Sequence, residues 1–299
     1  MTTATAPAGP AFVAPKQRRP WVALVLGAWG QARTKIGLAL VLLLVGSALI
    51  GPLFAPAEPA EFVAAPFAEP SGDALLGTDN LGRDVLSRFL WGGRSVLALA
   101  ILSTLIGVSL GVAVGLVAAY ARNVLDDVLM RTMDVILAFP QIVLALVAVA
   151  TVGPKLWLLV LVVGITTAPR VARVVRGAAL DVVERDFVRA AEGIGVSRNK
   201  ILFGEVLPNV TSPLVVEASL RLTFSIALIS ALSFLGFGLQ PPAADWGLMI
   251  NENRLGLEIQ PWGVVLPVIA IGLLTIGTSL IGDGFSRASI GIQRGARAE

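Results

Sequence analysis

The chain of 299 residues contains no cysteine and no histidine. These two absences exclude disulfide bridges, thiol catalysis, histidine general bases and most transition-metal sites. Charged residues make up only 14% of the sequence, whereas soluble globular domains carry about 25%. The net charge of +3 is small and dispersed, which argues against binding to nucleic acid. No phosphate-binding loop of the form G-x-x-x-x-G-K-[ST] occurs, so the chain lacks this common signature of ATP binding.

Apolar residues, in contrast, make up 56% of the sequence and are gathered in long runs. Several runs reach the roughly 20 residues with which a helix crosses the hydrocarbon core of a bilayer. The sequence therefore predicts an all-α polytopic membrane protein. We expect six transmembrane helices, at residues 36–54, 95–120, 134–152, 155–173, 212–235 and 263–282.

The region of the third and fourth predicted spans has an alternative interpretation, in which it forms one long kinked helix. The sequence between them, Gly153-Pro154-Lys155, is a turn signal, and the whole run is too long for one comfortable crossing. Charge supports two separate spans. With six spans and an internal N-terminus, 17 Lys and Arg lie inside and five lie outside. Five spans would place the seven cations of residues 169–200 outside, against the positive-inside rule.

The N-terminal region differs from the rest of the chain. Residues 1–15 are rich in Ala, Pro and Thr, a composition typical of disorder. The apolar piece that follows, Trp21 to Gly30, is short and has no convincing cleavage site after it, so we expect an interfacial helix rather than a signal peptide. We divide the chain into an N-terminal segment 1–35, a first span with an external segment 36–94, a core 95–285 that contains a loop 170–208, and a cytoplasmic tail 286–299.

The second predicted span carries three glycines at a spacing of four residues. Gly107, Gly111 and Gly115 lie on one face of a helix, and small residues on such a face let two membrane helices approach closely. The neighbour is either another helix of this chain or a helix of a partner subunit. Alternatively, the glycines reflect their higher frequency in membrane helices.

A charged, glycine-broken segment at residues 187–209, here named the polar island, interrupts the apolar sequence. Before it, Pro169 marks the expected end of the fourth span, and three arginines at helical spacing suit a helix that leaves the membrane among the headgroups. Residues 181–192 predict a short polar helix. Glycine at 193 and 195 would end that helix, and Ser197 would cap the next one. We therefore expect a rigid protrusion, although an ordinary amphipathic loop is the alternative. The three arginines are Arg170, Arg173 and Arg176.

The polar island resembles the coupling loop of ABC-importer permeases, through the Ala190-Ala191 pair, Gly195 and Leu207-Pro208. The pattern of that family has glutamate where this chain has Arg189. The resemblance implies that the island docks on a separate ATPase and passes its movement to the spans. The residues expected to take part are Arg189, Ala190, Ala191, Glu192, Gly195, Leu207 and Pro208.

The external segment resembles one branch of that family more specifically. Residues 76–88 follow the pattern LGTDxxGRDxLSR of the peptide/nickel branch, in its second-subunit type. Residues 232–247 and 281–284 also resemble this branch, so that the resemblance covers about residues 30–285 and fails in both tails. The defined residues of the external pattern include Gly77, Thr78, Asp79, Gly82, Arg83 and Asp84.

The charges of this external pattern predict ion pairs. Asp79 and Asp84 are spaced to pair with Arg83 and Arg88 within and beside a short helix. At an exposed surface such pairs stabilise little. The segment is either a self-satisfied surface turn or a platform that meets an external binding protein.

Two charged residues lie inside the fifth predicted span. Glu217 and Arg221 are four residues apart, so the carboxylate can neutralise the guanidinium on the same helix face. The pair is either a local stabilising pair or a substrate contact in a central cavity. The sequence alone leaves both open.

The resemblance implies a permease subunit of an ATP-driven, binding-protein-dependent importer, with a type I permease fold, in a bacterial plasma membrane and with both termini cytoplasmic. Di- or oligopeptides are the expected substrate, and nickel or another small solute is the alternative. Without His or Cys, the chain offers few soft ligands for nickel. The resemblance implies as partners a second homologous permease, two ABC ATPase subunits that hold ATP and Mg, an external solute-binding protein and lipid. The chain itself is expected to hold no cofactor and to catalyse no reaction.

Two other functions fit the sequence less well. A secondary transporter would need carboxylates or broken helices at the middle of the bilayer, and no acidic residue lies in the middle of a predicted span. An intramembrane enzyme without His or Cys would need a Ser/Lys or paired-Asp arrangement within the spans, and none is visible.

Overall fold

A computed structural model describes residues 20–298, so the predicted disorder of residues 1–15 lies outside the described part. The described residues form helices and no strand, which confirms the all-α class. The α-helices are α1 (Pro20–Trp29), α2 (Ala32–Ile50), α3 (Val85–Ala121), α4 (Val124–Leu137), α5 (Gln141–Val152), α6 (Leu156–Val183), α7 (Asp186–Gly193), α8 (Arg198–Ile201), α9 (Leu207–Asn209), α10 (Thr211–Phe234), α11 (Trp246–Asn253) and α12 (Trp262–Ala298). Short 3₁₀ turns follow α2 (Gly51–Phe54) and α11 (Arg254–Gly256), and a π-helical turn (Leu202–Val206) links α8 to α9.

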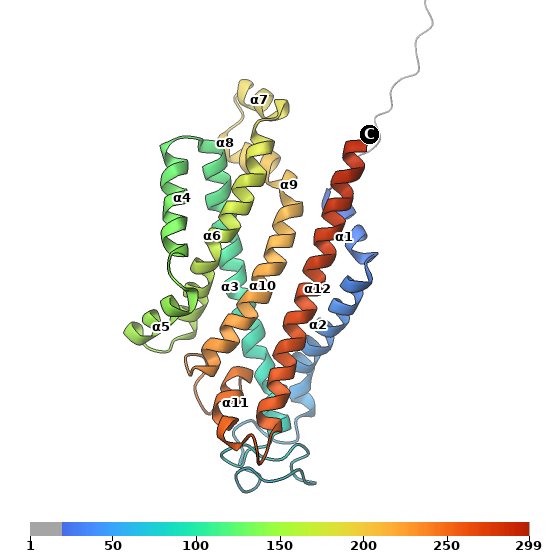
Figure 1. The fold of residues 1–299 in the computed structure, drawn as a ribbon, viewed down its shortest axis with the longest axis vertical. Coiled ribbons are helices and arrows are strands. Elements are labelled where there is room, and N and C mark those ends of the chain that lie inside the picture. The colour runs from blue at the N-terminus through green and yellow to red at the C-terminus, as the bar shows by residue number, and fades with distance from the viewer. Residues whose placement is uncertain (1–19, 299) are drawn as a thin grey trace, which may run out of the picture.

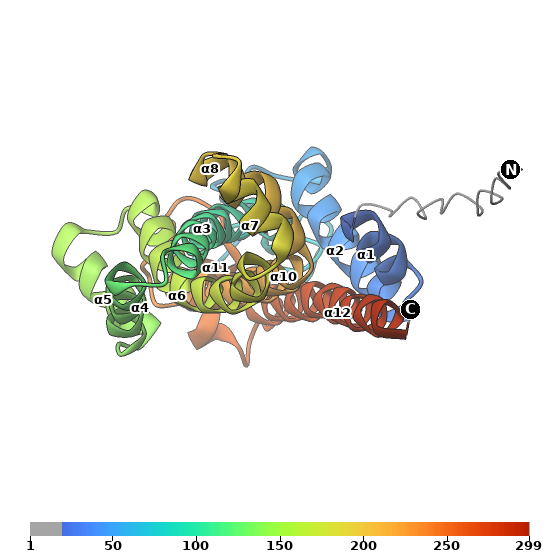
Figure 2. The ribbon, with the colours of Figure 1, turned by 90° about the horizontal axis from the view of Figure 1, so that it is seen from above.

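The long helices lie side by side in an elongated bundle with two distinct ends (Figure 1). Helices α7 and α8 lie at one end, named here the α7 end, and α11 with residues 55–84 lies at the other, named the α11 end. Helices α3, α6 and α10 form the middle of the bundle, with α4 and α5 on one side and α1, α2 and α12 on the other (Figure 2). The polar island and the external pattern are therefore at opposite ends of the molecule.

Within residues 20–298, five helices are long and apolar enough to cross a membrane, namely α2 with its 3₁₀ turn, α3, α6, α10 and α12. A sixth span exists if α4 and α5 are counted together, since they are bent by 80° against each other. The prediction of one helix over 134–152 is therefore wrong in detail. Pro140 lacks an N–H, and its ring disfavours a helical residue before it. The predicted turn between the third and fourth spans is confirmed at Gly153, whose φ is 92°.

Three spans have other bounds than the sequence predicts. Helix α3 begins at Val85 rather than at residue 95, because Asp84 caps it by accepting a hydrogen bond from the Ser87 N–H. Helix α6 continues through Pro169 to Val183, so that proline does not end the fourth span. Helix α12 continues without a break to Ala298, and the predicted tail is thus largely a continuation of the last span.

The glycine face of α3 packs against α6 of the same chain, which resolves the alternatives left open by the sequence. A Cβ on Gly107 would lie 2.8 Å from the Gly164 carbonyl oxygen, and one on Gly111 would lie 2.5 Å from Val171 Cβ. A Cβ on Gly115 would lie 2.6 Å from the Ala172 carbonyl oxygen. No side chain fits at these distances, so glycine is what permits the close contact.

The predicted N-terminal helix is confirmed as α1, and it packs on the last part of α12. Leu24 and Ala28 are buried there against Ala288. Farther along, α2 approaches α12 closely, since a Cβ on Gly37 would lie 2.5 Å from the Gly277 carbonyl oxygen. The first and last long helices therefore form one unit.

We predict that replacing Gly111 by valine destabilises the protein, because the new side chain overlaps Val171. Overpacking of a well-packed contact costs about 1–3 kcal/mol. The check is the thermal unfolding of the detergent-solubilised protein, with Gly46→Val on α2 as the matched control, since nothing lies within 4 Å of a Cβ at Gly46. Equal melting temperatures for the two variants would contradict this account.

Candidate functional site

The α7 end presents the polar island on a firm support. Helix α7 begins at Asp186, so residues 181–183 of the predicted polar helix belong to α6. Helix α7 ends at Gly193, and Gly195 has a φ of 79°, as expected for glycines that end a helix. Ser197 stands at the start of α8, but its side chain makes no capping hydrogen bond, so that part of the prediction is wrong.

Helix α7 has a buried face and an exposed face. Val188 is fully buried and Ala191 packs half-buried against the same cluster, which includes Ile201 and Val206. The exposed residues of the island include Arg189, Ala190, Glu192, Gly195 and Pro208, while Leu207 is half-buried. Ile194, at the end of α7, is 82% exposed. The island therefore offers an exposed surface that a partner can contact.

The support beneath α7 is the α3–α6 pair. The buried cluster that holds Val188 continues through Leu116 and Ala119 of α3 and through Val171 and Val175 of α6. Helix α6 leads into α7 across only two residues, so α7 is joined to the α3–α6 pair both through the chain and through the buried cluster.

Helix α4 is fastened to α6 by two ion pairs. Arg176 reaches Asp126 with two hydrogen bonds, both of 2.6 Å, and Arg173 pairs with Asp134. Two of the three arginines that the sequence assigned to the headgroup region thus have carboxylate partners on α4. Two-point contact between a guanidinium and a carboxylate fixes their relative orientation.

At the α11 end, the charges of the external pattern form a buried cluster, named here the ion cluster. Asp79 Oδ2 lies 2.6 Å from Arg83 Nε and 3.2 Å from Arg88 Nε. Glu252 Oε2, from α11, lies 3.1 Å from Arg83 Nη2 and 2.7 Å from Arg88 Nη2. All four side chains are at most 9% exposed. The prediction of exposed surface pairs is therefore wrong.

Sequence reasoning missed Glu252, and it misplaced Asp84. Glu252 is far from residues 76–88 along the chain, and no local spacing relates it to them; only the fold brings α11 against this segment. Asp84 pairs with no arginine among the described residues. It accepts hydrogen bonds from the N–H and the hydroxyl of Ser87 at the start of α3.

The other residues of the external pattern hold the loop in shape. Gly77 and Gly82 have φ values of 71° and 84°, where glycine is favoured. The Thr78 hydroxyl donates to the Ala65 carbonyl oxygen at 2.6 Å and accepts from the Ala68 N–H at 2.8 Å. These residues thus stabilise the conformation of the loop. A contact between this loop and a binding protein remains a prediction.

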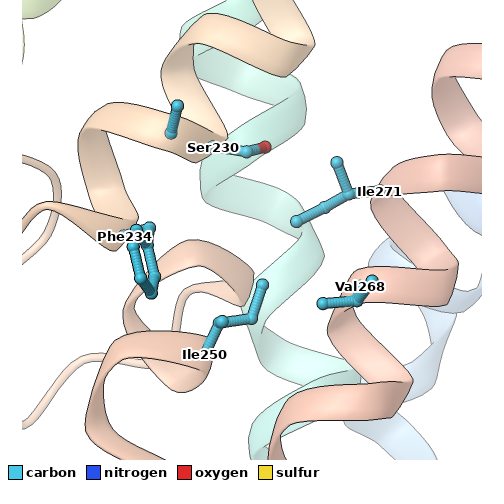
Figure 3. Close-up of a pocket in the computed structure, with 6 residues that line it drawn as sticks. Ser230, Phe234, Ile250, Val268 and Ile271 are labelled. Carbon is cyan, nitrogen blue, oxygen red and sulfur yellow. The ribbon is translucent and has the colours of Figure 1, made fainter. Parts of the chain in front are cut away.

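A hollow of about 310 Å³ lies between α10, α11 and α12, near the α11 end. Figure 3 shows side chains of all three helices around it, among them Ser230 and Phe234 of α10 and Ile250 of α11. The lining carries no charged side chain, and Ser230 supplies its only hydroxyl. Nothing in the sequence singled out this place, because its residues come from three separate segments.

Glu217 and Arg221 form the predicted pair on α10, with Oε1 of the glutamate 2.9 Å from Nε of the arginine. Both side chains are about nine-tenths buried. The guanidinium carbon also lies 5.0 Å from the centre of the Phe224 ring. The local pair is confirmed, while its role in transport is a separate question.

We predict that Glu252→Gln destabilises the α11 end, because it leaves two buried arginines with one carboxylate. Breaking a buried ion pair costs on the order of 3 kcal/mol. The check is the melting temperature together with protease cleavage of residues 55–84. Glu258→Gln is the matched control, since Glu258 is exposed and has no ion pair among the described residues. If both variants behave like the parent protein, the ion cluster does not hold this end together.

Comparison with known proteins gives consistent matches. Residues 111–290 match the family described as binding-protein-dependent transport system inner membrane component. The glutathione transport system permease protein GsiD of Pectobacterium atrosepticum is 41% identical over 219 residues, which are 73% of each chain. The di/tripeptide transport system permease protein DppC of Pseudomonas aeruginosa is 38% identical over 259 residues, covering 84% of this chain and 86% of that protein.

A third relative, the dipeptide transport system permease protein DppC of Alkalihalophilus pseudofirmus, is 35% identical over 219 residues, covering 73% of this chain and 72% of that protein. The family match includes the polar island, α10, α11 and most of α12. The resemblance to ABC-importer permeases that was found in the sequence agrees with these matches. It also agrees with the long apolar helices and with the packing of α7 on α3 and α6. The chain therefore belongs to the family of inner-membrane components of binding-protein-dependent transport systems.

Proposed function

We propose that this chain is a permease subunit of an ATP-driven peptide importer, in which it forms half of the translocation path. A second homologous permease would supply the other half. Two ABC ATPase subunits would bind ATP and Mg, and an external binding protein would deliver the peptide. The observation that carries the proposal is that α7 has two different faces. One face is exposed and available to a partner, and the other is buried and packs against α3 and α6.

The mechanism follows from the lengths and contacts of these helices. Helix α6 has 28 residues and α3 has 37, and at 1.5 Å per residue they extend about 42 and 55 Å. When the ATPases close, they would push α7, and the packed α3–α6 pair would turn as one body. Such a turn would open the path on one side of the membrane and close it on the other.

The orientation proposed here places the α7 end in the cytoplasm, with both termini inside. The α6–α8 region between residues 169 and 200 carries seven Lys and Arg, and cytoplasmic loops are enriched in these residues. The α11 end then faces outward, where the ion cluster would give the binding protein a rigid surface.

Peptides are the substrate best supported by the relatives. Their names refer to glutathione, di/tripeptides and dipeptides, which are all short peptides. The nickel alternative lacks support in the sequence, since His and Cys are absent from it and these are the softer ligands available to proteins.

The experiment is reconstitution of the complex in proteoliposomes, followed by ATPase and uptake assays with peptide-loaded binding protein. We expect loaded binding protein to stimulate ATP hydrolysis and peptide to accumulate. Ala190→Trp, on the exposed face of α7, is expected to reduce both by more than about tenfold, because a bulky side chain keeps the partner from close contact.

Ala138→Trp is the matched control, since Ala138 is also exposed but lies at the bend between α4 and α5. It is expected to leave both activities near the native level. Transport by the isolated chain on an ion gradient, without any ATPase, would refute the proposed function.

A further inference from the structure

The last turn of α2 lies against α3 close to the α11 end of the bundle (Figure 1). A Cβ on Gly93 of α3 would lie 2.8 Å from the Cβ of Ala48, so the two helices approach closely there. The apolar span that includes α2 ends at Phe54, and residues 55–84 follow it. The contact therefore lies near the level at which the chain leaves the hydrocarbon core of the membrane.

Arg94 of α3 is held in place at this level. Its Nε donates to the Ala48 carbonyl oxygen at 2.9 Å, and its Nη2 donates to the Leu49 carbonyl oxygen at 2.8 Å. The last carbonyls of a helix have no partner within it, so the guanidinium satisfies two of them at the end of α2. The guanidinium carbon also lies 5.0 Å from the centre of the Trp91 ring. These three contacts fix the position of the guanidinium.

Arg94 nevertheless keeps unused donors and an unpaired charge. Its Nη1, which carries two N–H groups, makes no hydrogen bond among the described residues. In that part of the chain Arg94 also has no ion pair, whereas Arg83 and Arg88 of the ion cluster each have carboxylate partners. A guanidinium donates readily to the oxygens of a phosphate or carboxylate. The half-buried Arg94 is therefore oriented to hold an anion.

A hollow of about 490 Å³ opens beside this guanidinium. Two of its walls face away from the bundle, since Leu49 is 59% exposed and Ile101 is 46% exposed. The hollow is thus a groove on the side of the α2–α3 pair, with one cation at its rim. Apart from Arg94, its lining consists of apolar side chains of α2 and α3, which are Val45, Leu49, Leu97, Ala98 and Ile101.

We propose that Arg94 and this groove bind one anionic phospholipid, with the phosphate on Arg94 and an acyl chain against the apolar walls. The two unused N–H groups match phosphate oxygens, and the lining, which holds no second charge, matches a hydrocarbon chain. The exposed Trp91 beside Arg94 fits the same level, because tryptophan is enriched at membrane–water interfaces. Phosphatidylglycerol fits better than phosphatidylethanolamine, whose ammonium group the guanidinium repels.

The lipid would join α2 to α3, because both helices supply walls of the groove and carbonyls of α2 orient the cation that holds the phosphate. A ligand that binds only the folded protein stabilises it in proportion to its occupancy. Two other occupants match only part of the site. Free phosphate leaves the apolar walls uncovered, and a helix of a second permease needs an acidic residue at the depth of Arg94.

The first experiment measures binding of phosphatidylglycerol to the full chain in detergent by native mass spectrometry. We expect the parent protein to bind one such lipid about tenfold more tightly than Arg94→Gln, as for loss of a hydrogen bond between charged groups. Arg254→Gln is the control, since Arg254 is exposed and does not line the groove, and it should bind like the parent. Equal affinities for Arg94→Gln and the parent, or equal binding of inorganic phosphate and lipid, would overturn the proposal.

The second experiment keeps Arg94 and its contacts with α2. Ala98→Trp fills the groove from an exposed position, and Ala39→Trp, exposed on α2 away from the groove, is the matched control. We expect phosphatidylglycerol to raise the melting temperature of the parent and of Ala39→Trp but not that of Ala98→Trp. The same rise in all three proteins would overturn the proposal.

The third experiment identifies the occupant in a membrane. A photoreactive benzoylphenylalanine replaces Ile101, and the complex is irradiated in vesicles that contain phosphatidylglycerol. We expect adducts with the lipid that weaken in the Arg94→Gln background. Adducts with a second permease in place of lipid would overturn the proposal. None of the three measurements depends on transport, so a failure of the proposed peptide import leaves their outcome unchanged.

Discussion

The close contact of α3 with α6 is the interaction on which the rest of the structure depends. Between two helices in lipid the hydrophobic effect contributes little, so their association relies on van der Waals contact at short distance. Gly107, Gly111 and Gly115 provide that distance, and the buried cluster at the α7 end extends the contact to Val188 of α7. Without this contact, α7 would not be held against the two long helices and could move independently of them. With it, α7 is the end of a stiff two-helix unit that reaches most of the length of the molecule (Figure 1).

The second constraint is the pairing of charged side chains, which differs between three places in the structure. At the α11 end, two arginines alternate with two carboxylates, and this neutral set is buried. Between α4 and α6, each of two arginines has its own aspartate. On α10, Arg221 pairs with Glu217 one turn before it on the same helix. At all three places the charged side chains pair within the chain, which suits permanent structure.

Much of this could be predicted from sequence, because the strongest signals are local. Apolar runs of membrane length located the spans, and the glycines at 193 and 195 located the end of α7. The failures concern what tertiary contacts decide. Pro140 breaks the third span at a point that hydropathy alone does not show. The burial of Asp79, Arg83 and Arg88 depends on Glu252, which the fold brings from a distant segment. The partner of the α3 glycines also became clear only when α6 was seen against them.

The central claim is that α7 and the α3–α6 pair move as one body. Because the sequence lacks cysteine, spin labels can be placed at two introduced cysteines alone. We suggest Arg185, exposed between α6 and α7, and Leu75, 59% exposed at the α11 end. Pulsed electron paramagnetic resonance on the assembled complex would then measure their separation without nucleotide and with trapped ATP. The account predicts an unchanged distance within this chain, while the distance from Arg185 to a label on the second permease changes. A changed separation within the chain, with no change between the permeases, would contradict it.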